Sequence, residues 1–94
     1  MEIIWTKTAK KNIRALWYNS PIEMEAAMKI YILGLLSYIE ILKCNPNLGK
    51  VLPKYKDYIC VRQLIYRKHK IIYTVEEDVY ILTIIANIRN VNYF

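Results

Sequence analysis

The order of apolar and polar residues near the start of the chain predicts a short strand followed by an amphipathic helix. Residues 2–6 (Glu-Ile-Ile-Trp-Thr) are mostly β-branched or aromatic, which are the residue types enriched in strands. A helix of roughly residues 8–18 follows, and Thr6 or Thr8 can cap its first turn. One side of this helix is apolar, with Ile13, Leu16 and Trp17. We therefore expect that side to pack on the fold while a basic side faces solvent.

A second, longer helix is predicted to run to about Lys43. Ser20 is a good N-cap, Pro21 suits the first helical position and Glu23 completes a capping box. The Asn-Pro-Asn-Leu-Gly segment at 45–49 ends the helix, because proline disfavours helical backbone in the residue before it. Two stripes lie along the helix, one of Ala26, Ile30, Leu33 and Ser37 and one of Met28, Ile32, Leu35, Ile39 and Leu42. We expect the first helix and a sheet to bury this surface, with cover by a partner chain as the alternative.

Three strand-like runs, at about 58–65, 69–76 and 79–86, complete the chain, and their short links predict antiparallel pairing. In the first run we expect helices to cover the side with Val61 and Ile65, which leaves Arg62 on the opposite, open face. The third run is apolar on both sides, as in a central strand. The predicted fold class is α+β in the order β-α-α-β-β-β, with a helical hairpin packed on one face of a mainly antiparallel, twisted sheet. Residues 1–94 would form a single domain.

Positive charge is concentrated around the hairpin that the first two runs would form. Between Lys50 and Lys70 there are seven Lys or Arg residues and one acid, so this window carries +6, which equals the formal net charge of the whole chain. A small protein with its charge gathered around one hairpin is expected to meet an anionic partner there.

Composition excludes several other classes of protein. Hydrophobic residues make up 55% of the chain and only two residues are glycine, which is typical of a compact globular protein. The longest apolar run, 30–42, is too short to span a membrane. Cys44 and Cys60 lack the spacing of metal ligands, and we expect both to be buried, reduced thiols, which fits the cytoplasm. We therefore expect no metal, no cofactor and no membrane partner.

An ordered set of short motifs covers nearly the whole chain. It comprises Ser20-Pro21, the Asn-Pro-x-x-Gly loop at 45–49, Val61-Arg62-Gln63-Leu64, Lys70-Ile71-Ile72-Tyr73, Val79-Tyr80-Ile81-Leu82 and Ile88-Arg89-Asn90. With these motifs in this order, the chain resembles the RelE/ParE superfamily of type II toxin–antitoxin toxins. The resemblance implies a bacterial growth inhibitor and a cognate antitoxin that wraps around it with an extended, often acidic segment. The two proteins would form a hetero-oligomer.

The resemblance also suggests candidate site residues. Arg62 and Arg89 match two family positions that supply arginine, and Lys54 and Lys56 lie in the loop where RelE-like enzymes place lysines. Tyr93 is near the position of a C-terminal tyrosine or histidine in those nucleases, but its offset from Arg89 differs from their pattern.

Tyrosine and histidine side chains are further candidates, on the basis of their residue type and position rather than of the resemblance. Tyr58 and Tyr66 are the tyrosines that we consider for ligand contact. His69 lies between two lysines, which disfavour its protonation, and we expect it to pack at the start of a strand.

Three functions remain open at this point. The favoured one is a ParE-like toxin that poisons DNA gyrase, because no well-placed acid or base lies at the C-terminus. The alternative is a RelE-like, metal-independent and ribosome-dependent messenger RNA endoribonuclease, in which Arg62, Arg89 and Tyr93 would be catalytic. The third is an inactive module that only binds an antitoxin. Positive charge fits all three, because gyrase–DNA, the ribosome and an acidic antitoxin are anionic.

Overall fold

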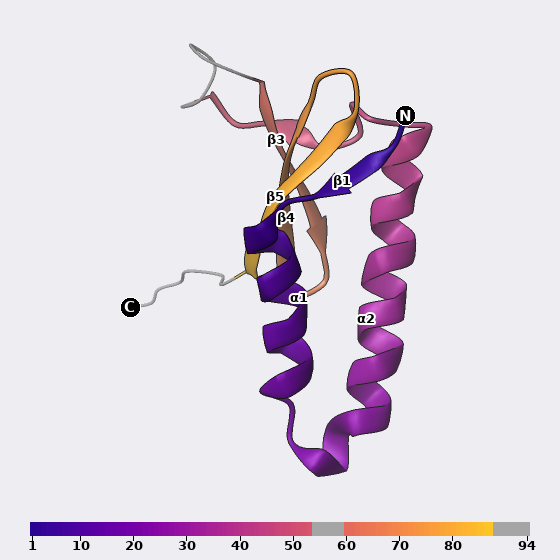
Figure 1. The fold of residues 1–94 in the computed structure, drawn as a ribbon, viewed down its shortest axis with the longest axis vertical. Coiled ribbons are helices and arrows are strands. Elements are labelled where there is room, and N and C mark those ends of the chain that lie inside the picture. Colours follow the sequence, from indigo (N-terminus) through magenta and orange to yellow (C-terminus); the bar gives the residue numbers. More distant parts are fainter. Residues whose placement is uncertain (54–59, 88–94) are drawn as a thin grey trace.

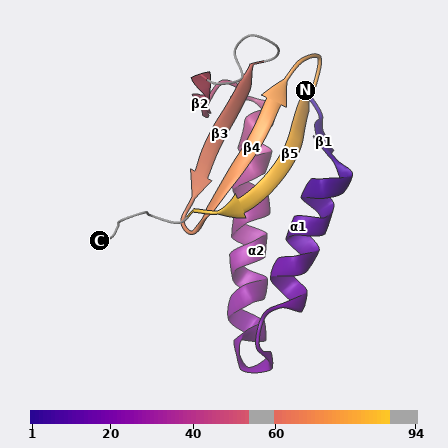
Figure 2. The same cartoon turned by 90° about the vertical axis from the view of Figure 1, so that its left-hand side faces the viewer.

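The computed structural model of the chain describes residues 1–53 and 60–87. Its centre is a five-stranded mixed sheet in the order β1-β5-β4-β3-β2, and a helical hairpin covers one face of the sheet (Figures 1 and 2). This arrangement confirms the predicted α+β class. The elements are β1 (Ile3–Trp5), α1 (Lys7–Tyr18), α2 (Glu25–Glu40), β2 (Lys50–Val51), β3 (Val61–Tyr66), β4 (His69–Val75) and β5 (Val79–Ala86). The two-residue strand β2 is an addition to the predicted order.

Thr6 joins the first strand to the first helix and to the centre of the sheet. β1 pairs in parallel with β5, while the other neighbouring strands pair antiparallel. The Thr6 hydroxyl accepts a hydrogen bond from the Ala9 N–H at 3.2 Å and donates one to the Ile81 carbonyl at 2.7 Å. The first bond caps α1, as predicted, and the second holds the start of the helix against β5.

Asn12 holds the middle of α1 against the same strand. Because β1 ends at Trp5, no strand of the described residues lies beside the outer edge of β5 beyond Ile81. The Asn12 side-chain oxygen accepts hydrogen bonds from the Ile84 N–H at 2.9 Å and from the Thr83 hydroxyl at 2.8 Å. A polar side chain on α1 thus satisfies part of a sheet edge that would otherwise be open to another chain.

The start of the second helix differs from the prediction. The backbone of Pro21 is extended (ψ 149°), and a single 3₁₀ turn, Ile22–Met24, precedes α2. No side chain caps this turn, and the Ser20 hydroxyl instead donates to the Pro21 carbonyl at 3.4 Å. The predicted capping box of Ser20 and Glu23 is therefore wrong, because an extended Pro21 carries Ser20 away from the first helical N–H groups. Within the described ranges, no helix is long and apolar enough to cross a membrane.

The hydrophobic core lies between α2 and the sheet and contains one stripe of the second helix. Its buried residues include Leu35, Ile39, Leu42, Leu64, Ile71, Tyr73, Val79 and Ile81. The other stripe stays in solvent, because Ile30 is 72% exposed and Leu33 is 54% exposed. The expectation that the fold itself buries both stripes is therefore wrong for the stripe with Ile30 and Leu33.

The side of β3 that faces the helices is the opposite of the predicted one. Leu64 pairs with Ile71 and Arg62 pairs with Tyr73, and both of these β4 residues are fully buried in the core beneath the helices. Ile65, by contrast, is 48% exposed. Since alternate residues of a strand face opposite sides, Arg62 lies on the helix-covered face, and its predicted place on the open face is wrong.

The two cysteines also differ from the expectation, because both are exposed. Cys44 follows the 3₁₀ turn Ile41–Lys43 that extends α2, and Cys60 directly precedes β3. Both positions lie in connections at the surface, where neither thiol joins the core.

Candidate functional site

Arg62 closes the loop between α2 and β2. Its Nη1 donates hydrogen bonds to the backbone carbonyls of Gly49, at 2.7 Å, and Asn47, at 3.2 Å. Both acceptors belong to the Asn-Pro-Asn-Leu-Gly segment that ends the second helix. Two of the five guanidinium N–H donors are thus directed at the protein's own backbone. Arg62 therefore acts as a clamp on this loop.

Tyr73 holds the same loop from β4. Its side chain is fully buried, and its hydroxyl accepts from the Gly49 N–H at 2.7 Å and donates to the Pro46 carbonyl at 2.8 Å. Burial raises the pKa of Tyr73 above its ordinary value, and the Gly49 N–H partly opposes this shift. A Cβ at Gly49 would lie 2.8 Å from the Gln63 carbonyl, so only glycine fits this approach of loop and strand.

Tyr66, predicted as a target contact, packs against α2. The centroid of its ring lies 5.5 Å from that of Tyr31 and 5.4 Å from that of Tyr38. Its hydroxyl rests on Gly34, where the helix has no side chain. Arg62 and Tyr66 therefore share one face of β3 but contact different parts of the molecule, the loop and the middle of α2.

The two-residue turn between β3 and β4 carries two exposed cations, Arg67 and Lys68. Arg67 has a φ of 50°, in the left-handed region that glycine and asparagine adopt most readily. The Lys68 carbonyl accepts from the Asn87 N–H at 2.7 Å, and the Lys68 N–H donates to the Tyr31 hydroxyl at 3.3 Å. The sheet and α2 thus hold both cations at the end of the hairpin.

His69 follows this turn and contacts the same tyrosine. Its Nδ1 is 2.7 Å from the Tyr31 hydroxyl oxygen, whereas the Tyr66 carbonyl is 3.3 Å from it. The shorter contact favours donation from Tyr31 to Nδ1, which places the imidazole proton on Nε2. Burial lowers the pKa of His69 below its ordinary value, and the charge of Lys68 lowers it further. Burial likewise raises the pKa of Tyr31.

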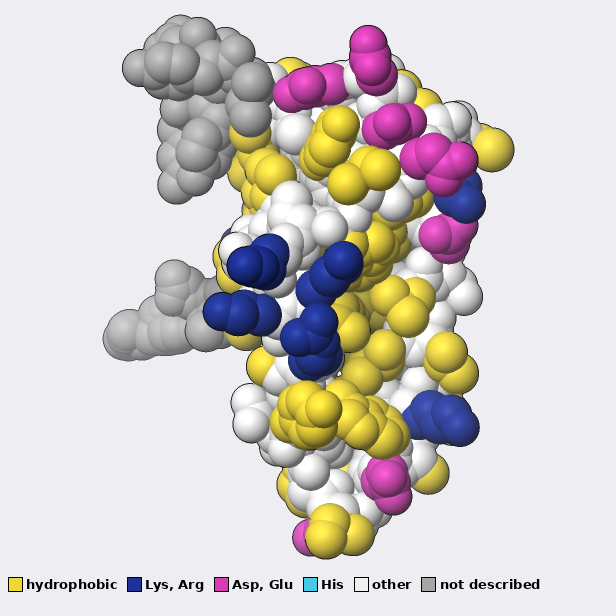
Figure 3. Space-filling model, viewed as in Figure 1, with side chains coloured by type: hydrophobic (Ala, Val, Ile, Leu, Met, Phe, Trp, Pro, Cys, Tyr) yellow, Lys and Arg dark blue, Asp and Glu magenta, His cyan; other side chains and the backbone are white. Residues whose placement is uncertain are grey.

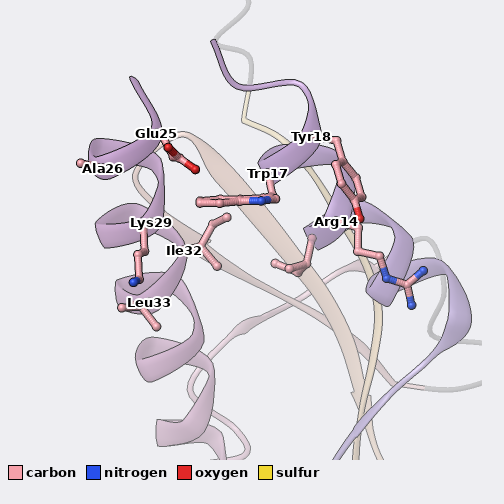
Figure 4. A pocket seen from close by; sticks show the side chains of 9 residues that line it. Arg14, Trp17, Tyr18, Glu25, Ala26, Lys29, Ile32 and Leu33 are labelled. Carbon is pink, nitrogen blue, oxygen red and sulfur yellow. The ribbon is translucent and has the colours of Figure 1, made fainter. Parts of the chain in front are cut away.

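A large hollow lies in the seam between α1 and α2 (Figure 4). It measures about 620 Å³ and is mostly apolar. Trp17 extends from α1 across the seam toward Glu25 and Ile32 of α2. The lining residues are Ile13, Arg14, Trp17, Tyr18, Glu25, Ala26, Lys29, Ile32 and Leu33. We call this hollow the helical groove.

The helical groove continues along α1 in both directions. A smaller hollow of about 100 Å³ at the tip of the hairpin shares Trp17 and Glu25 with it. Another, of about 230 Å³, shares Ile13 and Arg14 and reaches Trp5 near the sheet. α1 has 12 residues, so at 1.5 Å per residue the groove follows a helix about 18 Å long.

Positive charge borders the helical groove. Figure 3 shows Lys and Arg side chains gathered over α1, beside the apolar surface. The exposed cations of α1 are Lys7, Lys10, Lys11 and Arg14, and Lys29 stands on the opposite wall. Glu25 is the one acid among the described lining residues, and the one ion pair in residues 1–53 and 60–87 joins Lys43 to Glu40. The groove is therefore apolar at its floor and cationic at its rim.

Several predicted site residues cannot be compared with this geometry. Lys54, Lys56, Arg89 and Tyr93 lie outside the described residues, as does Tyr58. Their roles remain predictions.

The sequence alone did not identify the helical groove, although it predicted that the cationic hairpin would meet an anionic partner. The apolar stripe with Ile30 and Leu33 indicated surplus surface on the second helix, but not that Trp17 stands across from it. Two cations in place of the usual asparagine and glycine were the indication at the turn.

A sequence model of a known protein family matches most of the chain. The sequence model of the family described as "ParE toxin of type II toxin-antitoxin system, parDE" matches residues 3–89. This range includes every helix and strand of the described structure. No curated protein matches the chain.

Proposed function

Because the chain belongs to the ParE toxin family of type II toxin–antitoxin systems, we propose that it inhibits bacterial growth by poisoning DNA gyrase in the cytoplasm. In this proposal residues 1–94 form one toxin domain, and a cognate antitoxin neutralises it in a hetero-oligomeric complex. The alternative is the RelE-like cleavage of messenger RNA on the ribosome.

The role of Arg62 is the observation that favours a binding toxin over a nuclease. Metal-free RNA cleavage requires a cation free to stabilise the phosphate as charge develops, together with an acid and a base. Arg62 instead faces the helix-covered side of the sheet and donates to the carbonyls of Asn47 and Gly49. A guanidinium that clamps its own loop is poorly placed to serve a substrate on the open face.

Two assays on the same protein separate the mechanisms. Expression without the antitoxin should arrest growth, and the purified full chain should inhibit supercoiling by gyrase. In arrested cells, mapping of RNA 5′ ends should find no new ends that depend on ribosomes. Normal growth with folded protein would contradict the toxin assignment, whereas new ribosome-dependent ends without gyrase inhibition would support the RelE-like alternative.

The helical groove supports a more specific proposal for the antitoxin. Its apolar floor and length of about 18 Å suit the apolar side of about three helical turns. Its rim carries Arg14 and Lys29, with the other cations of α1 nearby, so acidic residues along the edges of such a helix would find opposite charge. We propose that an acidic, amphipathic helix of the antitoxin lies in this groove.

A matched pair of substitutions tests this docking surface. Leu33 lines the groove, whereas Ile30, 72% exposed on the same helix, does not. Leu33→Glu should weaken binding of the full-length cognate antitoxin about tenfold or more, because it places a charge on an apolar contact. Ile30→Glu introduces the same charge and should change the affinity less than about twofold. The affinities are measured by calorimetry. Equal losses of affinity in the two variants, or no loss in either, would contradict the groove as the docking site.

A further inference from the structure

Two hollows lie beside His69, the residue that follows the cationic turn of the hairpin. One, of about 320 Å³, lies between α2 and the turn, and the other, of about 420 Å³, lies between α1, α2 and β5. Both are lined by Met28 and His69, so the two hollows are neighbours. We call the two hollows together the hairpin cleft. Neither Met28 nor His69 lines the main hollow of the helical groove.

The hairpin cleft presents charge on one wall and flat or apolar surface on the others. Arg67 and Lys68 supply the charge, while Tyr31 and His69 supply aromatic rings and Met28 a thioether. No described residue that lines either hollow is an acid. Cations beside ring surfaces match a ligand that joins a phosphate to a flat base, which is a nucleotide. An acidic peptide would match the cations but offers no ring for the other wall.

The backbone of Arg67 adopts a conformation that is unfavourable for arginine. A left-handed residue in a two-residue hairpin turn is most stable as glycine, asparagine or aspartate. Arg67 occupies this conformation, with φ 50°. Conformational strain that surrounding contacts maintain is found preferentially at binding sites and active sites.

Those surrounding contacts also fix the turn before any ligand arrives. Tyr31 binds the Lys68 N–H, and Asn87 binds the carbonyls of both turn residues, at 3.4 Å for Arg67 and 2.7 Å for Lys68. The Arg67 guanidinium carbon lies 5.8 Å from the centroid of the Tyr66 ring. A turn held in this way loses little conformational entropy when it binds a ligand.

We propose that the hairpin cleft binds one nucleotide unit of a single-stranded nucleic acid. The phosphate would lie at Arg67 and Lys68, and the base against Tyr31, His69 and Met28. This inference goes beyond the proposed function, because it requires neither gyrase nor the antitoxin. Its test therefore uses the full-length protein alone and can fail while the proposed function stands.

The test measures the anisotropy of short labelled single strands, DNA and RNA in separate arms, at several salt concentrations. The double variant Arg67→Asn/Lys68→Gln should lower the affinity at least fivefold and reduce the salt slope by about 1.4, which is about 0.7 for each lost phosphate contact. Lys10→Gln/Lys11→Gln removes the same charge from exposed positions of α1 that do not line the cleft, and should leave the slope near that of the parent. Equal losses of strand affinity in the two double variants would show only non-specific electrostatic attraction and would overturn the proposal.

Stability and competition complete the test. Arg67→Asn alone should raise the thermal unfolding midpoint while it weakens strand binding, because asparagine tolerates the left-handed backbone. A variant that binds weakly because it is misfolded would show a lower midpoint, and strand binding that Arg67→Asn leaves unchanged would overturn the role of this residue. A nucleoside monophosphate should compete better than inorganic phosphate or a polyglutamate peptide. Equal competition by phosphate or polyglutamate would overturn the base contact. A monophosphate that binds as tightly as the strand would identify the free nucleotide as the ligand and would overturn the proposal of a single-stranded nucleic acid.

Discussion

At the scale of single residues, Arg62 shows how a cation can hold a loop. A hydrogen bond from a charged donor contributes about 1.5–3 kcal/mol when its partner is shielded, and Arg62 makes one partly buried bond and one exposed bond. We expect Arg62→Ala to lower the free energy of unfolding by about 2 kcal/mol in urea denaturation. Arg62→Lys keeps the charge but not the planar guanidinium, so the stability of this variant should fall between those of the parent protein and of Arg62→Ala. A fully stable alanine variant would contradict the loop clamp.

His69 should make stability depend on pH. Tyr31 contacts its ring, and Arg67 and Lys68 line the same hollow. Among the described residues that line the cleft, no acid favours its charged form. Its pKa is lowered in the folded state by burial and by Lys68. As the pH falls through about 6.5, His69 of the unfolded chain therefore binds a proton, while His69 of the folded chain stays neutral. This contribution to stability is complete above about pH 6.5 and is lost as the pH falls toward the lower folded value.

The measurement for His69 is urea denaturation on both sides of that pH. The parent protein should lose more stability on acidification than His69→Gln, because glutamine cannot titrate. The difference between the two proteins removes the contribution of carboxylates elsewhere. Parallel pH profiles would show that His69 is as basic in the fold as in the unfolded chain.

At the scale of elements, the contact between α2 and β3 depends on a glycine inside a helix. Gly34→Ala would ordinarily favour the helix by about 1 kcal/mol. A Cβ here would collide with the Tyr66 hydroxyl, and the ring carbon bearing that hydroxyl is at 3.4 Å. We expect Gly34→Ala to destabilise the parent but to stabilise a Tyr66→Phe background, which lacks the hydroxyl. A double-mutant cycle of unfolding free energies measures this coupling, and additive effects would contradict the contact.

The order of elements could be predicted from the sequence because its determinants are local. Apolar periodicity, the Thr6 cap and the loop at 45–49 each act within a few residues of the element they define. The side of β3 that faces the helices could not, because Val61 and Ile65 are as apolar as Leu64 and Tyr66. The choice depends on Gly34, which is distant in sequence and leaves the space that Tyr66 fills. The capping box failed because the backbone of Pro21 is extended, so the helix does not begin at the residue after Ser20.

At the scale of the whole molecule, the sequence predicted that an anionic partner would meet the hairpin, but it predicted neither the helical groove nor the hollow beside the turn. The structure places Arg67 and Lys68 at the turn of that hairpin, and Arg14 and Lys29 at the rim of the helical groove. Both surfaces arise from tertiary packing. The groove requires two separate helices to expose apolar residues along their seam, and the cleft requires the hairpin turn to meet the middle of α2.

These two surfaces lie on opposite sides of α2, which makes their independence testable. Ala26, Lys29 and Leu33 line the groove, whereas Ala27 and Tyr31 line the cleft, and at 100° per residue these sets face away from each other. We expect Leu33→Glu to weaken antitoxin binding and leave strand binding within about twofold, and Arg67→Asn to do the reverse. A saturating oligonucleotide should likewise leave the antitoxin affinity within about twofold in calorimetry. Direct competition would mean that the antitoxin reaches around α2 to the hairpin turn, so that neutralisation would also block the cleft.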